Sequence, residues 1–207
     1  MKYFNFSRVI YVFTAVLFFT ASFSGCMNET LEGPGLEDQE AAVSDDFHEM
    51  GGEYLRISPA EQNKILAGIR GATAKYHRLE VAEASGYDLD THCVEVPGLG
   101  GMGHHAVNFV LIDGEVNPLM PEVLVYEPSK NGKYQLVAVE YLVDAGAWHG
   151  EDEDREPPMI GGVPFDDHRN FLEKGGPPFP HYQLHIWVWK NNPNGLYAPF
   201  NPNVKCP

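Results

Sequence analysis

Four segments in the second half of the chain have the composition of β-strands, and they constrain the fold more than any other feature. They are rich in Val, Ile, Tyr, Phe and Trp, and proline, glycine and asparagine bound them. The segments span residues 106–112, 122–127, 134–143 and 182–190. The polar run between the second and third segments is typical of a turn, so it predicts that these two segments form an antiparallel hairpin.

An amphipathic pattern precedes these segments and predicts one long helix over about residues 59–85. Ser58, Pro59 and Glu61 form a helix-start signature, with a capping serine, a proline at the first helical position and the glutamate of a capping box. Apolar residues then recur at helical spacing, and Gly86 is typical of a helix C-terminus. We therefore expect an α+β fold, in which one long N-terminal helix packs on a mostly antiparallel, curved and loop-rich sheet.

The first 25 residues have the order of a secretory leader. Lys2 and Arg8 precede an apolar run, small residues follow, and Cys26 comes next. This order resembles a bacterial lipoprotein signal peptide with its lipobox. The resemblance implies that the leader is removed and that a lipid such as palmitate on Cys26 anchors the protein to a membrane of the cell envelope, on its periplasmic or outer-surface side. A plain secretory signal and an uncleaved membrane anchor are the alternatives, although the apolar run is short for a span of about 20 residues.

Composition divides the rest of the chain into a tether and one domain. Residues 26–52 are acidic and poor in large apolar groups, so we expect a flexible tether there. Residues 53–207 have the length of a single globular domain. The net charge of the chain is −15, and loss of the leader, whose charged residues are Lys2 and Arg8, makes it −17. This charge argues against nucleic acid as a partner, because phosphate binding needs a basic surface.

Two cysteines, Cys93 and Cys206, remain when Cys26 carries a lipid. In an oxidising envelope, two remaining cysteines predict one disulfide. The alternative is that Cys93, which follows His92, is a metal ligand or a reactive thiol.

Seven of the nine histidines lie between residues 92 and 185. A glycine-rich run leads into His104 and His105, which should point to opposite faces if the chain is extended there. In the last strand-type segment, alternate residues should share one face of the sheet. These residues are His181, Gln183, His185, Trp187 and Trp189.

Glu140 lies within the apolar run 137–143, where burial is expected. An unpaired buried carboxylate is costly, so it must take up a proton, pair with a cation or bind a metal ion. The strand-type segments contain no arginine and only a terminal lysine, so a histidine or a metal ion is the natural partner, and Glu127 is a second carboxylate for such a site. The alternatives are a solvent-facing Glu140 or a pair with Arg70 or Arg78 of the predicted helix.

These residues together predict a mononuclear metal site in which His105, His181 or His185 binds the ion with Glu140. Imidazole and carboxylate ligands suit Zn, Cu, Fe or Ni. The spacing fits no named zinc motif. The metal-free alternative is a histidine–glutamate pair that acts as general acid and base.

Two other hypotheses belong to different functional classes. An aromatic face that contains Tyr182, Trp187 and Trp189 would suit a non-catalytic binding module for a small apolar or sugar-like ligand. The acidic run 151–154 would suit an interaction protein that docks a basic partner.

From Cys93 to Cys206 the chain is similar to a group of uncharacterised secreted bacterial proteins. Four short segments carry the similarity: GGMGHH (100–105), PEVLVYEP (121–128), VEY (139–141) and HIWVW (185–189). The resemblance implies no reaction and no catalytic residues.

Overall fold

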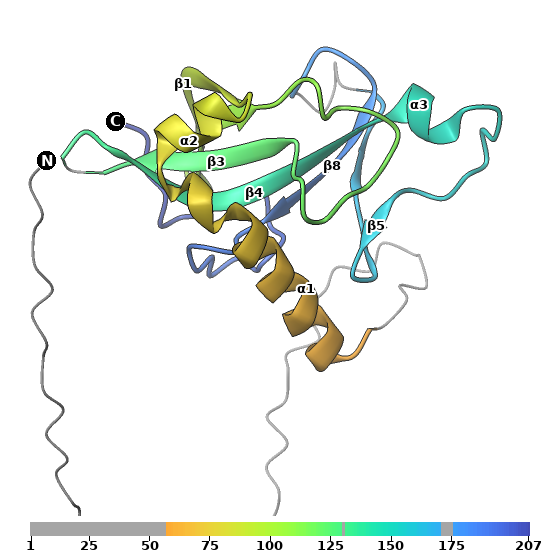
Figure 1. Cartoon of the computed structure of the whole chain (residues 1–207), viewed down its shortest axis with the longest axis horizontal. Coiled ribbons are helices and arrows are strands. Elements are labelled where there is room, and N and C mark those ends of the chain that lie inside the picture. The colour runs from red at the N-terminus through yellow and green to blue at the C-terminus, as the bar shows by residue number, and fades with distance from the viewer. Residues whose placement is uncertain (1–56, 130, 171–175) are drawn as a thin grey trace, which may run out of the picture. The chain divides into compact units, whose positions relative to one another are not determined.

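In the part of the chain that the structure describes, six antiparallel strands form the main sheet, in the order β1-β2-β3-β4-β8-β7 (Figure 1). They are β1 (Asp88–Val96), β2 (Gly100–Val107), β3 (Val123–Pro128), β4 (Tyr134–Asp144), β7 (Asp166–His168) and β8 (His181–Ile186). A small second sheet pairs β5 (Met159–Ile160) with β6 (Val163–Pro164). The helices are α1 (Pro59–Thr73), the 3-10 helix η1 (Ala74–His77), α2 (Leu79–Ala84) and α3 (Ala145–His149).

The structure is a computed structural model that describes residues 57–129, 131–170 and 176–207, all within one compact unit of the chain. The predicted leader and tether, with the lipidation site at Cys26, lie outside the described residues. Within the described ranges, no helix is both long enough and apolar enough to cross a bilayer.

The prediction of one long N-terminal helix over 59–85 is wrong. Helix α1 ends at Thr73, the short η1 follows, and the backbone at Arg78 is extended, with φ −96° and ψ 106°. The carbonyl of Tyr76 accepts a hydrogen bond from the hydroxyl of Tyr126 at 2.7 Å, in place of the amide that a continuing helix would supply. This tertiary contact overrides the helical periodicity. The described domain is therefore a sheet-rich antiparallel fold with short helices.

Helix α1 nevertheless begins with the predicted capping box. The amide of Glu61 donates to Ser58 Oγ at 3.3 Å, and the amide of Ser58 donates to the Glu61 carboxylate at 3.0 Å. Two amides that the first helical turn leaves without partners are thus satisfied.

Replacement of Ser58 by alanine should lower the free energy of unfolding by about 1 kcal/mol, because the amide of Glu61 loses its acceptor. Urea unfolding measures this difference. Lys64→Ala, at an exposed position of the same helix, is the matched control and should change the free energy by only a few tenths of a kcal/mol. An unfolding midpoint unchanged by Ser58→Ala would contradict the prediction.

The sheet separates two apolar clusters. Helices α1 and α2 lie across one face (Figure 1), where Leu66, Ile69 and Ala82 pack in the larger cluster with Tyr126 and Tyr141. The opposite face carries a smaller cluster. Its buried members are Val123, Val125, Val137, Ala138, Leu142, Trp187 and Val204.

The C-terminal segment 196–206 packs on the face of the smaller cluster and is fixed to β1 and β2. The predicted disulfide between Cys93 and Cys206 is present, with a Cα–Cα distance of 5.6 Å, so Cys93 is neither a metal ligand nor a free thiol. The amide of Gly101 donates to the carbonyls of Asn201 and Val204 at 3.2 and 3.1 Å. A Cβ at the neighbouring residue 100 would clash with the Asn201 carbonyl, and only glycine allows this close approach.

The strand predictions are partly confirmed. The hairpin predicted from 122–127 and 134–143 is the β3–β4 pair. The strand predicted over 106–112 lies earlier in the chain, because β2 spans Gly100–Val107. The strand predicted over 182–190 is β8, which ends at Ile186. Strand β1, in which five of nine residues are polar, was not predicted.

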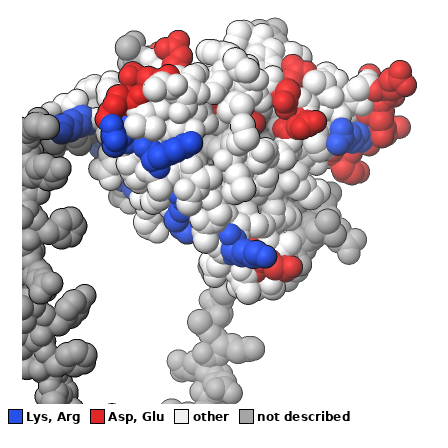
Figure 2. All heavy atoms as spheres, viewed as in Figure 1, with Lys and Arg blue, Asp and Glu red and all other residues white. Residues whose placement is uncertain are grey.

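The connection between β4 and β8 contains regular structure. Helix α3, the β5–β6 pair and β7 all lie within it. The acidic run 151–154 is exposed and follows α3, and Figure 2 shows acidic side chains gathered there.

Candidate metal site

One cross-strand row places Glu140 beside a histidine of the next strand. The register pairs Val107 with Val123, Val123 with Glu140, and Glu140 with His185. Directly opposed residues point to the same face of a sheet, so these side chains all lie on the face of the smaller cluster. His105 precedes Val107 by two positions on β2 and therefore also points to this face.

The side chains of His105, Glu140 and His185 converge. His105 Nε2 lies 3.4 Å from Glu140 Oε2, and His185 Nδ1 lies 3.5 Å from Glu140 Oε1. One ligand atom from each residue lies within 4.8 Å of the other two. The nitrogen–oxygen separations exceed the about 2.7–2.9 Å of a charge-assisted hydrogen bond. Each distance, measured to a different oxygen of Glu140, is close to the about 3.4 Å expected between two ligand atoms that each lie about 2.0–2.1 Å from one tetrahedral zinc ion.

The group is buried and incompletely hydrogen-bonded. The exposed fraction of the side chain is 2% for His185, 6% for Glu140 and 17% for His105. His185 Nε2 is buried and has no hydrogen-bond partner within the described part of the chain. Buried polar atoms are almost always satisfied, so a nitrogen in this state calls for a specific explanation.

None of the predicted cationic side chains neutralises Glu140. Arg70 donates to a backbone carbonyl of residue 188 at 2.7 Å, and Arg78 forms an ion pair with a glutamate two residues further along the chain. Glu127 does not join the group either, because its carboxylate accepts a hydrogen bond from Lys190 at 2.6 Å.

Burial sets the protonation states of the three residues. Burial, with a smaller contribution from the carboxyl of Glu122, raises the pKa of the Glu140 carboxyl to about 8. Burial lowers the pKa of His105 to about 4 and that of His185 to about 3. Both imidazoles are therefore neutral at pH 7, which is the form that binds metal ions, whereas Glu140 must lose a proton to become a ligand.

The metal-free protein should lose stability as the pH rises from about 6.5 to 8. The carboxyls of Glu140 and Glu122 both have pKa values of about 8 in the folded state, above their ordinary value of 4.5. Between pH 4.5 and 8 the folded state holds more protons than the unfolded state. The stability that the two protonated carboxyls contribute is therefore lost as the pH rises through their folded pKa.

Below pH 6.5 the two histidines act in the opposite direction. The pKa values of His105 and His185 are lower in the folded state than in the unfolded state, so the unfolded state takes up protons first as the pH falls. The stability that the two neutral histidines contribute is therefore lost as the pH falls toward 4. Urea unfolding in the presence of a chelator, at pH 6.5, 7.25 and 8, measures the net effect. Glu140→Gln should remove part of the decline above pH 6.5. A wild-type stability that is constant or rises over this interval would contradict the prediction.

The other candidate histidines of these strands do not belong to the group. His181 lies on the same face of β8 as His185, but four residues correspond to about 13 Å along a strand. Its Nδ1 lies 2.6 Å from the carbonyl oxygen of Phe179, and its Nε2 lies 3.3 Å from Gln183 Oε1. His104 faces the larger cluster, opposite to His105 as predicted, and packs against Tyr134 of β4.

Trp187 and Trp189 do not form one aromatic face. Strand β8 ends at Ile186, so the alternation that would place both indoles on one side stops there. Trp187 packs in the smaller cluster, and its Nε1 donates to the Ala198 carbonyl at 2.6 Å. Trp189 packs in the larger cluster, and its Nε1 donates to Thr73 Oγ1 at 3.2 Å.

Sequence reasoning missed two acidic residues near the group. Glu122 lies just before the first residue of β3, and its carboxylate accepts a hydrogen bond from the amide of Leu142 at 3.1 Å. This bond continues the contact with β4 past the start of β3. Asp90 of β1 acts on His105, because its negative charge opposes the lowering of the histidine pKa by burial. No pattern in the sequence distinguishes either residue from the many other acids.

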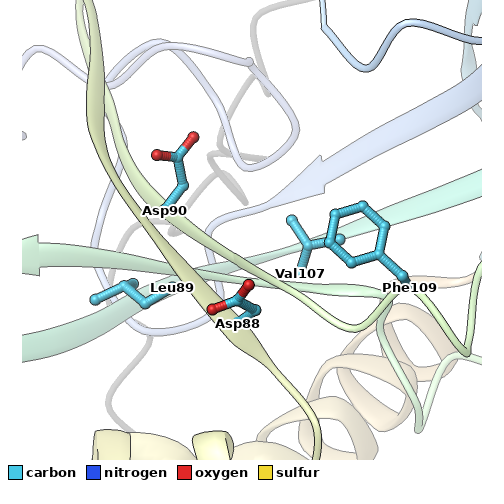
Figure 3. Close-up of a pocket in the computed structure, with 5 residues that line it drawn as sticks. All are labelled: Asp88, Leu89, Asp90, Val107 and Phe109. Atoms are coloured by element: carbon cyan, nitrogen blue, oxygen red, sulfur yellow. The ribbon is translucent and has the colours of Figure 1, made fainter.

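A hollow of about 380 Å³ lies against β1. Its lining residues come from β1 and the end of β2: Asp88, Leu89, Asp90, Val107 and Phe109 (Figure 3). Asp88 is paired with Val107, which belongs to the same cross-strand row as Glu140. His105, Glu140 and His185 do not themselves line the hollow.

No family model, curated protein or solved structure matches this chain.

Proposed function

We propose that this protein binds one divalent first-row transition metal ion through His105, Glu140 and His185. The spacing of the ligand atoms carries the proposal: a buried carboxylate lies 3.4 and 3.5 Å from two neutral imidazoles, as it would around a single ion. A divalent cation also supplies the charge that a buried ionised Glu140 needs, because no lysine or arginine in the described ranges forms an ion pair with it.

Three protein ligands leave at least one position on the ion for water or another molecule. A zinc ion in such a site lowers the pKa of bound water to about 7, and two imidazoles with one carboxylate are also a donor set for iron. The ion would therefore supply either water activation or oxygen chemistry. We expect a further ligand to approach from the side of β1 and β2, where Val107 lines the hollow two residues from His105.

Elemental analysis is the direct test. Protein purified from the cell envelope without chelators or a histidine tag should contain about one transition metal ion per chain. Metal-stripped protein should take up one equivalent of Zn²⁺ or Cu²⁺ in a competition titration. Protein that contains no metal and takes up neither ion would overturn the proposal.

His185→Ala and His181→Ala form a matched pair, since both residues are buried histidines on the same face of β8. His185→Ala should lower the affinity for Zn²⁺ by more than the about 10–100-fold that loss of an outer partner costs. His181→Ala should bind Zn²⁺ within about threefold of the wild type. Equal affinities for the two variants would contradict the assignment of His185.

We also infer that the site works in the cell envelope, where a lipid on Cys26 anchors the protein. The order of the leader supports this localisation, and the Cys93–Cys206 disulfide is typical of oxidising compartments. Cys26→Ser should abolish metabolic labelling with palmitate and release the protein from the membrane fraction. A variant that keeps the label would contradict the proposed anchor.

A further inference from the structure

The imidazole of His185 lacks the support that metal-binding histidines usually have. Such a histidine normally donates its second ring N–H to a carboxylate or a carbonyl, and this bond fixes the orientation of the ring. In His185, Nδ1 faces Glu140, and Nε2 has no hydrogen-bond partner within the described ranges. Packing must therefore hold this ring in place.

Trp187 provides the packing. Its ring system stacks on the imidazole of His185, with a centroid distance of 6.4 Å and an angle of 23° between the planes. Both side chains are buried, and Trp187 follows His185 by two residues on the same face. The Trp189 indole, by contrast, packs in the larger cluster on the other side of the sheet.

The C-terminal segment in turn holds Trp187. The indole Nε1 donates to the Ala198 carbonyl at 2.6 Å, and the backbone amide of Trp187 donates to the Leu196 carbonyl at 2.9 Å. Further along this segment, Val204 is fully buried in the same cluster as Trp187, and Cys206 is bonded to Cys93 of β1. Direct contacts therefore connect the disulfide to the ring of His185.

We infer that Trp187 is a positioning residue for His185, and that the disulfide-anchored C-terminal segment thereby sets the metal affinity of the site. This inference rests on the proposed function. A dithiol that reduces the Cys93–Cys206 bond would leave two protein thiols and itself become a disulfide. Reduction would free the end of the segment and weaken metal binding.

Zn²⁺ competition titrations of metal-stripped variants test the inference, with correct folding checked by circular dichroism. Trp187→Leu removes the stacked ring and should lower the affinity about 10–100-fold. Trp187→Phe keeps an aromatic ring on the imidazole and should restore the affinity to within about threefold. Trp189→Leu, which alters the other face, should bind like the wild type. The visible spectrum of bound Co²⁺ should change in Trp187→Leu and not in Trp189→Leu.

Several outcomes would overturn the inference. One is a folded Trp187→Leu variant with wild-type affinity and an unchanged Co²⁺ spectrum. If Trp187→Leu fails to fold, the wild type is measured after a dithiol has reduced the disulfide and the reagent, which itself binds Zn²⁺, has been removed. The affinity should fall about tenfold or more, and an unchanged affinity would refute the coupling. A wild type that binds no metal at all would instead refute the proposed function.

Discussion

Replacement of Glu140 by glutamine should lower the affinity of the protein for Zn²⁺ by at least about 100-fold, which exceeds the usual cost of losing an outer-shell partner. Glutamine has nearly the same shape, but it cannot ionise, so the site keeps two neutral imidazoles and loses its only negative charge. The same substitution should stabilise the metal-free protein above pH 7, because the buried side chain at position 140 then has no proton to release. Isothermal titration calorimetry and urea unfolding at pH 8 measure the two effects.

Glu122→Gln is the matched control for this experiment. Glu122 is also buried, and burial raises the pKa of its carboxyl to about 8 as well. Its carboxylate, however, bonds to the amide of Leu142 and does not belong to the three-residue group. The Glu122→Gln variant should therefore bind Zn²⁺ within about threefold of the wild type. Equal losses in both variants would show that burial of charge in this sheet, and not ligation by Glu140, determines the affinity.

Removal of the disulfide by the double substitution Cys93→Ser and Cys206→Ser should destabilise the protein by an amount on the order of 4 kcal/mol. The bond joins residues 113 positions apart, so its loss greatly increases the freedom of the unfolded chain. The melting temperature should fall by about 10 °C for a domain of this size.

Thermal unfolding of the oxidised wild type and the double variant measures the difference. In the presence of a dithiol the two proteins should melt at nearly the same temperature, because the wild type then also lacks the bond. A difference that persists under reducing conditions would mean that the serines, and not the missing bond, destabilise the variant.

The sequence indicated that histidines and Glu140 would form the candidate site, but not which histidines belong to it. A carboxylate in an apolar strand and alternating histidines on a later strand both indicated one ion site, and these features can be read locally. Which histidine meets Glu140 depends on the pairing of β4 with β8: Glu140 lies opposite His185, whereas His181 lies opposite Asp144. A long connection separates the two strands, so no local pattern determines their register.

The prediction of one long helix was wrong for a related reason. The apolar spacing of residues 59–85 is helical, but the hydroxyl of Tyr126, from a distant strand, bonds to the carbonyl of Tyr76 where the helix would have continued. The two indoles do not share one face because the chain bends after Ile186, where the amide of Val188 donates to the Ile186 carbonyl at 2.9 Å. In both cases a short-range pattern is correct until a specific backbone contact ends it.

The place of β8 beside β4 also determines when the site can form during synthesis. His105 and Glu140 emerge from the ribosome well before His185, which lies on the last strand of the sheet. A growing chain therefore offers an incomplete ligand set until β8 has been made. The domain would therefore bind an ion at this site only after β8 has paired with β4, and a bound ion would indicate that this pairing is complete.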